Sequence, residues 1–190
     1  FGRRIKSLVF STDVAIIKNI NTDAVIAVYP FTPQPQISQA IISVSDVPVF
    51  VGVGGGLTSG ERSVRLATVA ENQGAFGVVV NAPIPPQVIT AIKNCVEIPV
   101  IATIVSANQD IEERLAAGVD ILNVSAAAKT PQVVAKIRDK HPNIPIIATG
   151  GPTDQTILAT IQAGANAVTY TPPSTGELFA QTMQRYRETI

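Results

Sequence analysis

Short apolar runs recur along the whole chain, and each is followed by a segment with the apolar spacing of a helix. The runs are nearly continuous stretches of Val, Ile and Ala, which is typical of strands buried on both faces of a parallel sheet. Strands that alternate with helices predict an α/β fold with right-handed crossovers. The runs occupy residues 7–12, 24–30, 48–54, 75–81, 99–105, 120–125, 145–150 and 167–171. Eight such units predict a single (β/α)8 TIM barrel domain over residues 1–190, with an open doubly wound sheet as the alternative.

The predicted strands begin in two ways that alternate along the chain. The third, fifth and seventh runs begin at a proline, whose missing N–H is tolerated at the first residue of a strand. The fourth, sixth and eighth runs begin after a glycine of the kind that ends a helix. In chain order these residues are Pro48, Gly74, Pro99, Gly118, Pro145 and Gly164. The alternation predicts a four-fold βαβα pseudo-repeat within the eight-stranded parallel barrel.

Composition narrows the functional classes. Lys plus Arg and Asp plus Glu are 14 each, so the zero net charge gives no support for binding nucleic acid. No apolar stretch reaches the roughly 18 residues of a membrane span. The single Cys95 excludes an internal disulfide, and its position between apolar helix residues predicts a packed thiol. A cytoplasmic protein, with a homo-oligomer formed through outer helices as one option, fits these features.

The carboxyl ends of the strands are the expected location of a site, because barrel enzymes carry their chemistry on the loops that follow the strands. Polar side chains at these positions are suited to hydrogen bonding a small ligand. The predicted substrate-binding residues are Thr12, Tyr29, Thr32, Arg62, Asn81, Thr103, Asn123, Ser125 and Lys129. Inward-facing polar residues of this kind can equally satisfy one another in the upper layer of the barrel.

The last two loops predict a phosphate site. Gly150 and Gly151 would let backbone N–H groups approach an anion, and Ser174 would present the start of the last helix. Thr171 lies between them, at the end of the eighth run. The alternative is that the two glycines form only a tight turn. The segment 172–173 is Pro-Pro and lacks two N–H donors, which weighs against phosphate binding there.

These terminal segments carry a family resemblance. Residues 144–153, taken with 163–168, resemble the ends of the phosphate-binding barrel superfamily, which includes ribulose-phosphate epimerases, indole-glycerol-phosphate synthase, thiamine-phosphate synthase and 2-keto-3-deoxy-6-phosphogluconate aldolase. Residues 117–151 are similar to inosine-monophosphate dehydrogenase and nitronate monooxygenase barrels. The resemblance covers the second half of the chain and implies a ribulose-phosphate-binding-like barrel, with no specific activity.

Acid–base candidates are few. Asp13 is a possible general base whose alternative role is the N-cap of the first helix. Glu61 follows a glycine-rich loop over residues 54–60, where Glu61 and Arg62 replace the Lys-Ser/Thr of a P-loop. No run ends in the lysine that Schiff-base chemistry needs. The only histidine, His141, precedes the seventh run, so no metal site is expected.

The residues together predict a protein that binds a small anionic, phosphorylated metabolite. As an enzyme, it would act as an isomerase or lyase through proton transfer by Asp13 or Glu61, with hydrolysis as a further option. The alternative is a non-catalytic metabolite sensor, similar in strand pattern to the glycerol-3-phosphate-responsive antiterminator barrels. A second alternative is an oxidoreductase that binds FMN, because the flavin itself would supply the chemistry.

Overall fold

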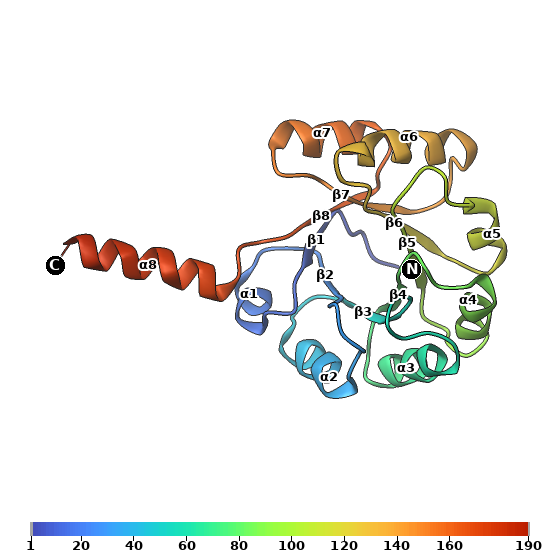
Figure 1. Cartoon of the computed structure of the whole chain (residues 1–190), viewed down its shortest axis with the longest axis horizontal. Coiled ribbons are helices and arrows are strands. Elements are labelled where there is room, and N and C mark those ends of the chain that lie inside the picture. The colour runs from blue at the N-terminus through green and yellow to red at the C-terminus, as the bar shows by residue number, and fades with distance from the viewer. Residues whose placement is uncertain (1, 190) are drawn as a thin grey trace.

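The computed structural model describes residues 2–189 and shows a closed barrel of parallel strands surrounded by helices (Figure 1). The strands pair in chain order, and β8 pairs with β1 to close the barrel. The strands are β1 Ser7–Phe10, β2 Ala24–Ala27, β3 Val49–Gly54, β4 Gly77–Val80, β5 Val100–Ile104, β6 Ile121–Val124, β7 Ile146–Thr149 and β8 Ala167–Tyr170. The predicted (β/α)8 barrel is confirmed, and the open sheet is excluded.

One helix follows each strand, with an additional 3-10 turn after β6. The helices are α1 Val14–Asn19, α2 Pro35–Val44, α3 Glu61–Asn72, α4 Pro86–Lys93, α5 Ile111–Ala116, η1 Ala127–Lys129, α6 Thr130–Lys140, α7 Asp154–Gln162 and α8 Thr175–Thr189. Gly74, Gly118 and Gly164 follow the ends of α3, α5 and α7 with φ of +91°, +102° and +108°. A side chain is strained at such φ values, which explains glycine at these helix ends.

Two apolar layers hold the barrel together. Alternate strand residues point into the barrel, where Leu8, Ile26, Phe50 and Ile101 are almost fully buried. Phe50 meets Phe76 edge to face, with ring centroids 5.5 Å apart. This packing fills the lower interior and leaves the carboxyl ends of the strands as the open end.

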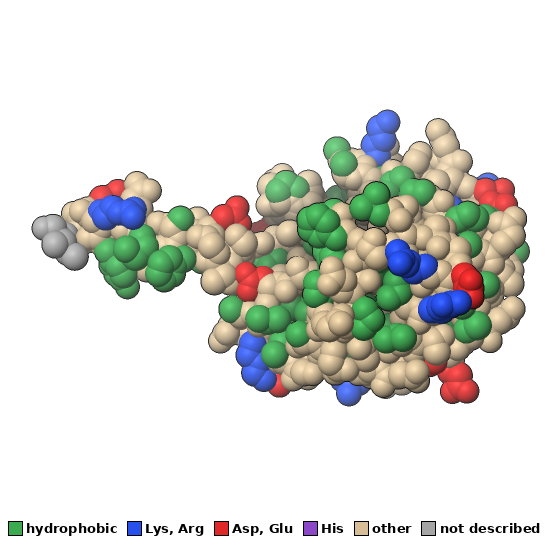
Figure 2. All heavy atoms as spheres, turned by 60° about the horizontal axis from the view of Figure 1, so that its bottom comes forward, with side chains coloured by type: hydrophobic (Ala, Val, Ile, Leu, Met, Phe, Trp, Pro, Cys, Tyr) green, Lys and Arg blue, Asp and Glu red, His purple; other side chains and the backbone are tan. Residues whose placement is uncertain are grey.

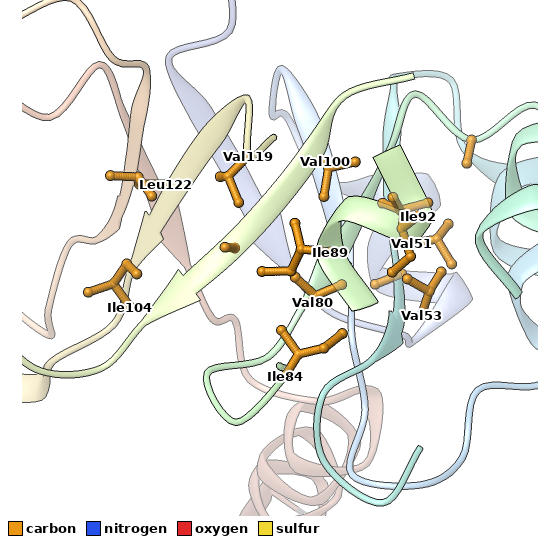
Figure 3. Close-up of a cluster of buried hydrophobic side chains, with 14 of the residues drawn as sticks. Val51, Val53, Val80, Ile84, Ile89, Ile92, Val100, Ile104, Val119 and Leu122 are labelled. Carbon is orange, nitrogen blue, oxygen red and sulfur yellow. The ribbon is translucent and has the colours of Figure 1, made fainter. Parts of the chain in front are cut away.

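The outer layer lies between the strands and the helices (Figure 3). The outward side chains of β3, β4 and β5 include Val51, Val80 and Val100, all buried. Ile89 and Ile92 of α4 are fully buried in the same cluster. The continuous apolar character of the strand sequences follows from this arrangement, since both faces of each strand are covered.

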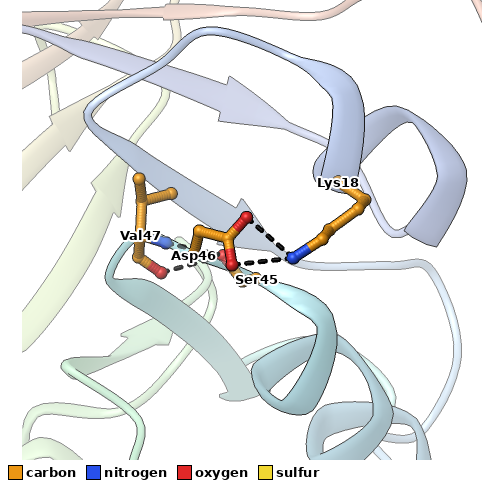
Figure 4. A network of polar contacts seen from close by, with 4 residues as sticks. All are labelled: Lys18, Ser45, Asp46 and Val47. Carbon is orange, nitrogen blue, oxygen red and sulfur yellow. Dashed lines mark hydrogen bonds and ion pairs between the residues drawn. The ribbon is translucent and has the colours of Figure 1, made fainter.

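Surface contacts add small local contributions. Lys18 Nζ on α1 lies 2.7 Å from Asp46 Oδ1, in the turn that leads to β3 (Figure 4). In the same turn Ser45 Oγ donates to the Val47 carbonyl over 2.8 Å. Both charged side chains of the ion pair are more than half exposed, so the pair contributes no more than about 1 kcal/mol.

Three further features bear on the sequence predictions. Cys95 is exposed, so the prediction of a packed thiol is wrong; it lies in the turn after α4 rather than within the helix. His141 ends α6, and its Nε2 lies 3.2 Å from a Glu112 carboxylate oxygen. None of the described helices is both long enough and apolar enough to serve as a membrane span.

Helix α8 departs from the pattern of the other helices. It projects away from the barrel instead of packing on its outer face (Figure 1). None of its residues is buried. The space between α7 and α1, where the eighth helix of a regular barrel would lie, is uncovered.

The outer layer gives a direct stability test. Replacing Ile92 by Ala removes a fully buried side chain, and we expect the free energy of unfolding to fall by about 2 to 5 kcal/mol. Urea denaturation followed by circular dichroism measures the change. Ile37→Ala on α2 is the matched control, because Ile37 is 37% exposed and its loss should cost less than about 1 kcal/mol. Equal losses in the two variants would contradict the assignment of the core.

Candidate functional site

The open end of the barrel contains a cavity of about 260 Å³. Its polar lining consists of hydroxyl and amide side chains contributed by the ends of β4 to β8. These residues are Asn81, Thr103, Asn123, Ser125, Thr149, Thr169 and Thr171. Five of the seven are among the residues predicted from the sequence. We call this space the mouth cavity.

Hydrogen bonds within the mouth cavity leave donors free. The Asn123 amide donates to Thr103 Oγ1 over 3.4 Å, and Thr149 Oγ1 donates to Ser125 Oγ over 3.2 Å. Thr169 is 8% exposed, and its hydroxyl has no hydrogen-bond partner among the described residues. A buried hydroxyl without a partner is costly, and a ligand in the cavity would satisfy it.

A second cavity of about 300 Å³ adjoins the first and shares Val28 and Asn81 with it. We call it the loop cavity, because the β2–α2 and β3–α3 loops form much of its wall. Thr58 lines it and is 3% exposed, and its hydroxyl also lacks a partner in the described chain. Tyr29 lines it too, and the Tyr29 hydroxyl accepts a hydrogen bond from the Gln34 N–H over 2.7 Å.

Steric contacts explain why glycines occupy the start of the loop after β3. A Cβ at Gly55 would lie 2.5 Å from the Asn81 backbone nitrogen, and one at Gly54 would lie 2.1 Å from Ser63 Oγ. Both glycines also have positive φ. Close backbone approach, rather than a nucleotide phosphate, therefore accounts for glycine at these positions.

Both cavities are lined without charge. No Asp, Glu, Lys, Arg or His is among the lining residues that the structure describes. The barrel helices begin at this end, because each follows the carboxyl end of a strand. The positive ends of the helix dipoles therefore lie at this end of the barrel, but carboxylates at the starts of α1, α3, α5, α7 and α8 offset them.

Asp13 makes structural hydrogen bonds at the rim. Its Oδ1 accepts from the N–H groups of Ala15 and Ile16, so Asp13 is the N-cap of α1. Its Oδ2 accepts from the Thr175 N–H at the start of α8, over 2.9 Å. Hydrogen bonds from Thr175 hold the pKa of the Asp13 carboxyl below its ordinary value. A carboxylate held this way is a weak base, and it lines neither cavity.

The other predicted charged residues also lie outside the two cavities. Glu61 pairs with Arg65 one helical turn along α3, at 2.6 Å, and its side chain is 78% exposed. Arg62 and Lys129 are exposed as well. Thr12 and Thr32 line neither cavity. Among the predicted substrate-binding residues, the structure brings Tyr29 to the loop cavity and Asn81 to both cavities. It also brings Thr103, Asn123 and Ser125 to the mouth cavity.

The predicted phosphate residues are only partly brought together. Thr171 lines the mouth cavity, but the Gly150 N–H donates to the Thr169 carbonyl in the barrel. Ser174 and Glu177 bond reciprocally at the start of α8, and the bonds from Ser174 lower the pKa of Glu177. The carboxylates of Asp13 and Glu177 thus occupy this helix start, which disfavours an anion there. Phosphate binding at this loop stays a prediction.

Three polar residues of the two cavities were absent from the predicted site. Thr149 is the last residue of β7 and Thr169 the last but one of β8. They pair in register, and both line the mouth cavity. Alternation along β8 could have revealed Thr169, which lies two residues before Thr171. Thr58 carried no signal in the sequence, because a loop threonine is ordinarily exposed.

Comparison with known proteins shows the fold. No protein-family model and no curated protein sequence matches the chain. Among solved structures, 2,3-dimethylmalate lyase, a member of the PEP mutase/isocitrate lyase superfamily, superposes with a TM-score of 0.74 at 12% identity, over 97% of this chain and 81% of that one. Phosphoenolpyruvate phosphomutase from Streptomyces platensis subsp. rosaceus gives 0.72 at 18% identity, over 100% and 83%.

A third neighbour is phosphonopyruvate hydrolase in complex with oxalate and Mg²⁺, with a TM-score of 0.71 at 14% identity, over 96% of this chain and 80% of that one. All three are similar to this chain as barrels. They support the TIM-barrel part of the sequence resemblance, and none of them belongs to the phosphate-binding barrel families that the sequence suggested. Identities this low establish the fold alone.

The hydrogen bonds of Asp13 predict a pH-dependent contribution to stability. Asp13→Ala should lower the free energy of unfolding by about 1 kcal/mol near neutral pH, because it removes an N-cap. The folded-state pKa is below the ordinary 3.8, so the stabilisation is complete above that value and is lost as the pH falls below it. Denaturation at several pH values measures the difference from wild type. Asp139→Ala on α6 is the control, and an equal loss in that variant would contradict the role of Asp13.

Proposed function

We propose that the barrel binds a small anionic metabolite in the mouth cavity, through neutral hydroxyl and amide donors. The observation that carries this proposal is the buried Thr169 hydroxyl, which faces the cavity without a partner. Asn81, Asn123 and Thr171 offer further hydrogen-bonding groups around it. No Asp or Glu of the described chain lines the cavity itself, so its lining does not repel an anion. A phosphorylated or carboxylated metabolite of a few carbons matches the cavity volume of about 260 Å³.

The lining favours binding over acid–base catalysis. Neither predicted catalytic carboxylate reaches the cavity: Asp13 caps two helices and Glu61 pairs with Arg65. The non-catalytic metabolite sensor is therefore the function that this geometry supports best. The ligand would be held by hydrogen bonds, and the function of the site would be binding rather than a chemical reaction.

A magnesium ion like that of the hydrolase neighbour does not fit the residues present. Mg²⁺ is bound in proteins through one or two carboxylates together with water or substrate oxygens. The mouth cavity offers only hydroxyls and amides, and no cluster of three His, Cys, Asp or Glu residues exists in the described part of the chain. We derive no step through a metal for this barrel.

Lyase or isomerase chemistry is the second candidate, and the barrel neighbours that are lyases and mutases favour it. In this case Asp13 or Glu61 would act as the base after a rearrangement of the rim. The PEP mutase and lyase neighbours share the fold with this chain at 18% identity or less, so this candidate rests on analogy.

The binding proposal is tested by thermal denaturation in the presence of glycerol phosphate, pyruvate, inorganic phosphate and glycerol. We expect at least one of the anions to raise Tm by several degrees, because a ligand that binds only the folded state stabilises it. Thr169→Val keeps the side-chain shape and removes the hydroxyl, so it should weaken binding about tenfold to a hundredfold. Isothermal titration measures the affinity.

Thr68→Val on α3 is the matched control for Thr169→Val, because Thr68 bonds only within its helix and lines neither cavity. It should leave the affinity unchanged. Equal shifts with glycerol and glycerol phosphate would contradict the anionic part of the proposal. If the Thr169→Val variant bound the ligand with unchanged affinity, the mouth cavity would not be the binding site.

The choice between sensor and enzyme is tested by hydrogen exchange at carbon. We expect pyruvate, whose methyl protons are acidic because they lie next to a carbonyl, to show no deuterium incorporation above that of buffer when it is incubated with the protein in D2O. The reason is that no acid–base side chain lines the cavity. Proton NMR follows the exchange. Exchange that disappears in Glu61→Gln or Asp13→Asn would instead establish the second candidate.

A further inference from the structure

The outside of the barrel has a further cavity, between two of its helices. It measures about 200 Å³ and lies between α5 and α6, which are neighbours in the outer ring of helices (Figure 1). The β5–α5 loop and the first turn of α5 form one wall, and α6 with His141 forms the other. We call this space the α5–α6 groove. It shares no lining residue with the mouth cavity or the loop cavity, so it is a separate place on the molecule.

Side chains of opposite charge line the two walls of the groove. Asp110 and Glu112 belong to the α5 wall. Lys136 and Lys140 belong to the other wall and lie one turn apart on α6. Lys136 Nζ donates to the Ala107 carbonyl over 3.1 Å, which leaves two of the three ammonium donors unused. No ion pair in the described chain joins either lysine to either carboxylate, so the opposite charges share one cavity without meeting.

His141 adds a ring nitrogen without a hydrogen bond. Its Nε2 is buried, and the Glu112 carboxylate oxygen 3.2 Å away does not have the orientation of a hydrogen bond. No other group in the part of the chain that the structure describes bonds to this atom. A buried polar atom without a partner is costly, and a ligand donor placed beside Glu112 would satisfy it.

The grouping of charge in the groove differs from the surface elsewhere. On the face that Figure 2 shows, charged side chains stand singly or in pairs among apolar and uncharged ones. The groove instead brings four charged side chains and a histidine to one cavity. Between the charged walls the lining is apolar, since Val133 and Ile137 of α6 are each 3% exposed and line the groove together with Ile111.

We propose that the α5–α6 groove binds a free α-amino acid with a small apolar side chain. The ligand carboxylate pairs with Lys136 and Lys140. The ligand ammonium group donates to Glu112 and to the Nε2 of a neutral His141 that carries its proton on Nδ1. The apolar side chain of the ligand packs on Val133 and Ile137.

Charge and size together select this class of ligand. A molecule with a single charge would leave one wall of the groove unpaired, whereas a zwitterion pairs with both walls. The volume of about 200 Å³ is below the roughly 300 to 1,000 Å³ of pockets for drug-sized ligands, so it suits an amino acid better than a nucleotide. The proposal is independent of ligand binding in the mouth cavity.

The test uses the whole chain, isotope-labelled for amide NMR, with L-valine as the probe. We expect valine to shift the amide signals of residues 106–112 and 133–141. The Kd should be on the order of millimolar, because exposed ion pairs are individually weak. Isovalerate lacks the ammonium group and isobutylamine lacks the carboxylate, so each should bind at least about fivefold more weakly than valine. The proposal would be overturned by shifts confined to the mouth cavity, or by no shift in the groove at tens of millimolar valine.

Two substitutions assign the ends of the ligand. Glu112→Gln and Lys136→Met each remove one charge from the groove, and each should weaken valine binding about fivefold. In Glu112→Gln the preference for valine over isovalerate should also shrink, because the ammonium group has lost its partner. Asp139→Asn is the matched control: it removes a carboxylate from α6 that does not line the groove, and it should leave the affinity unchanged. Equal affinities in Glu112→Gln and Asp139→Asn would show that the groove is not the site.

Discussion

Closure of the barrel through the β1–β8 pairing is the constraint on which the candidate site depends. Leu8 pairs with Thr169 and Val9 with Tyr170, so the first and last strands of the chain share one hydrogen-bonded ladder. Closure removes the edge strands and gives every strand an inside and an outside. It also turns the polar residues at the ends of five different strands toward one cavity. The mouth cavity therefore cannot form without the longest-range contact of the fold.

Much of this arrangement is encoded locally and could be predicted. The apolar runs predict strands buried on both faces, and Gly74, Gly118 and Gly164 mark helix ends; together these features suffice for the barrel. The rule that barrel sites lie at the carboxyl ends of strands brings Asn81, Asn123 and Thr171 into the predicted site. Each of these inferences depends on chain order and periodicity alone, which a sequence displays directly.

The remainder depends on contacts between distant residues. The sequence places Asp13 at the rim but does not show that Thr175, 162 positions away, donates to it. Glu61 follows the loop after β3, where a catalytic residue of a barrel is expected. In the structure its side chain is exposed and pairs with Arg65, so it lines neither cavity. The outward course of α8 has no local signal either, because its amphipathic pattern is the same as that of a helix packed on its own barrel.

The wall between the two cavities has a consequence for ligand choice. Asn81 lines both, and its backbone nitrogen lies close to Gly55, so the wall has little freedom to move. A compact ligand of the proposed site would occupy one of the two cavities, whereas a longer one would extend past the Asn81 side chain. In the proposed binding site, Asn81 would therefore limit the length of the ligand, and a smaller side chain at this position would join the two cavities.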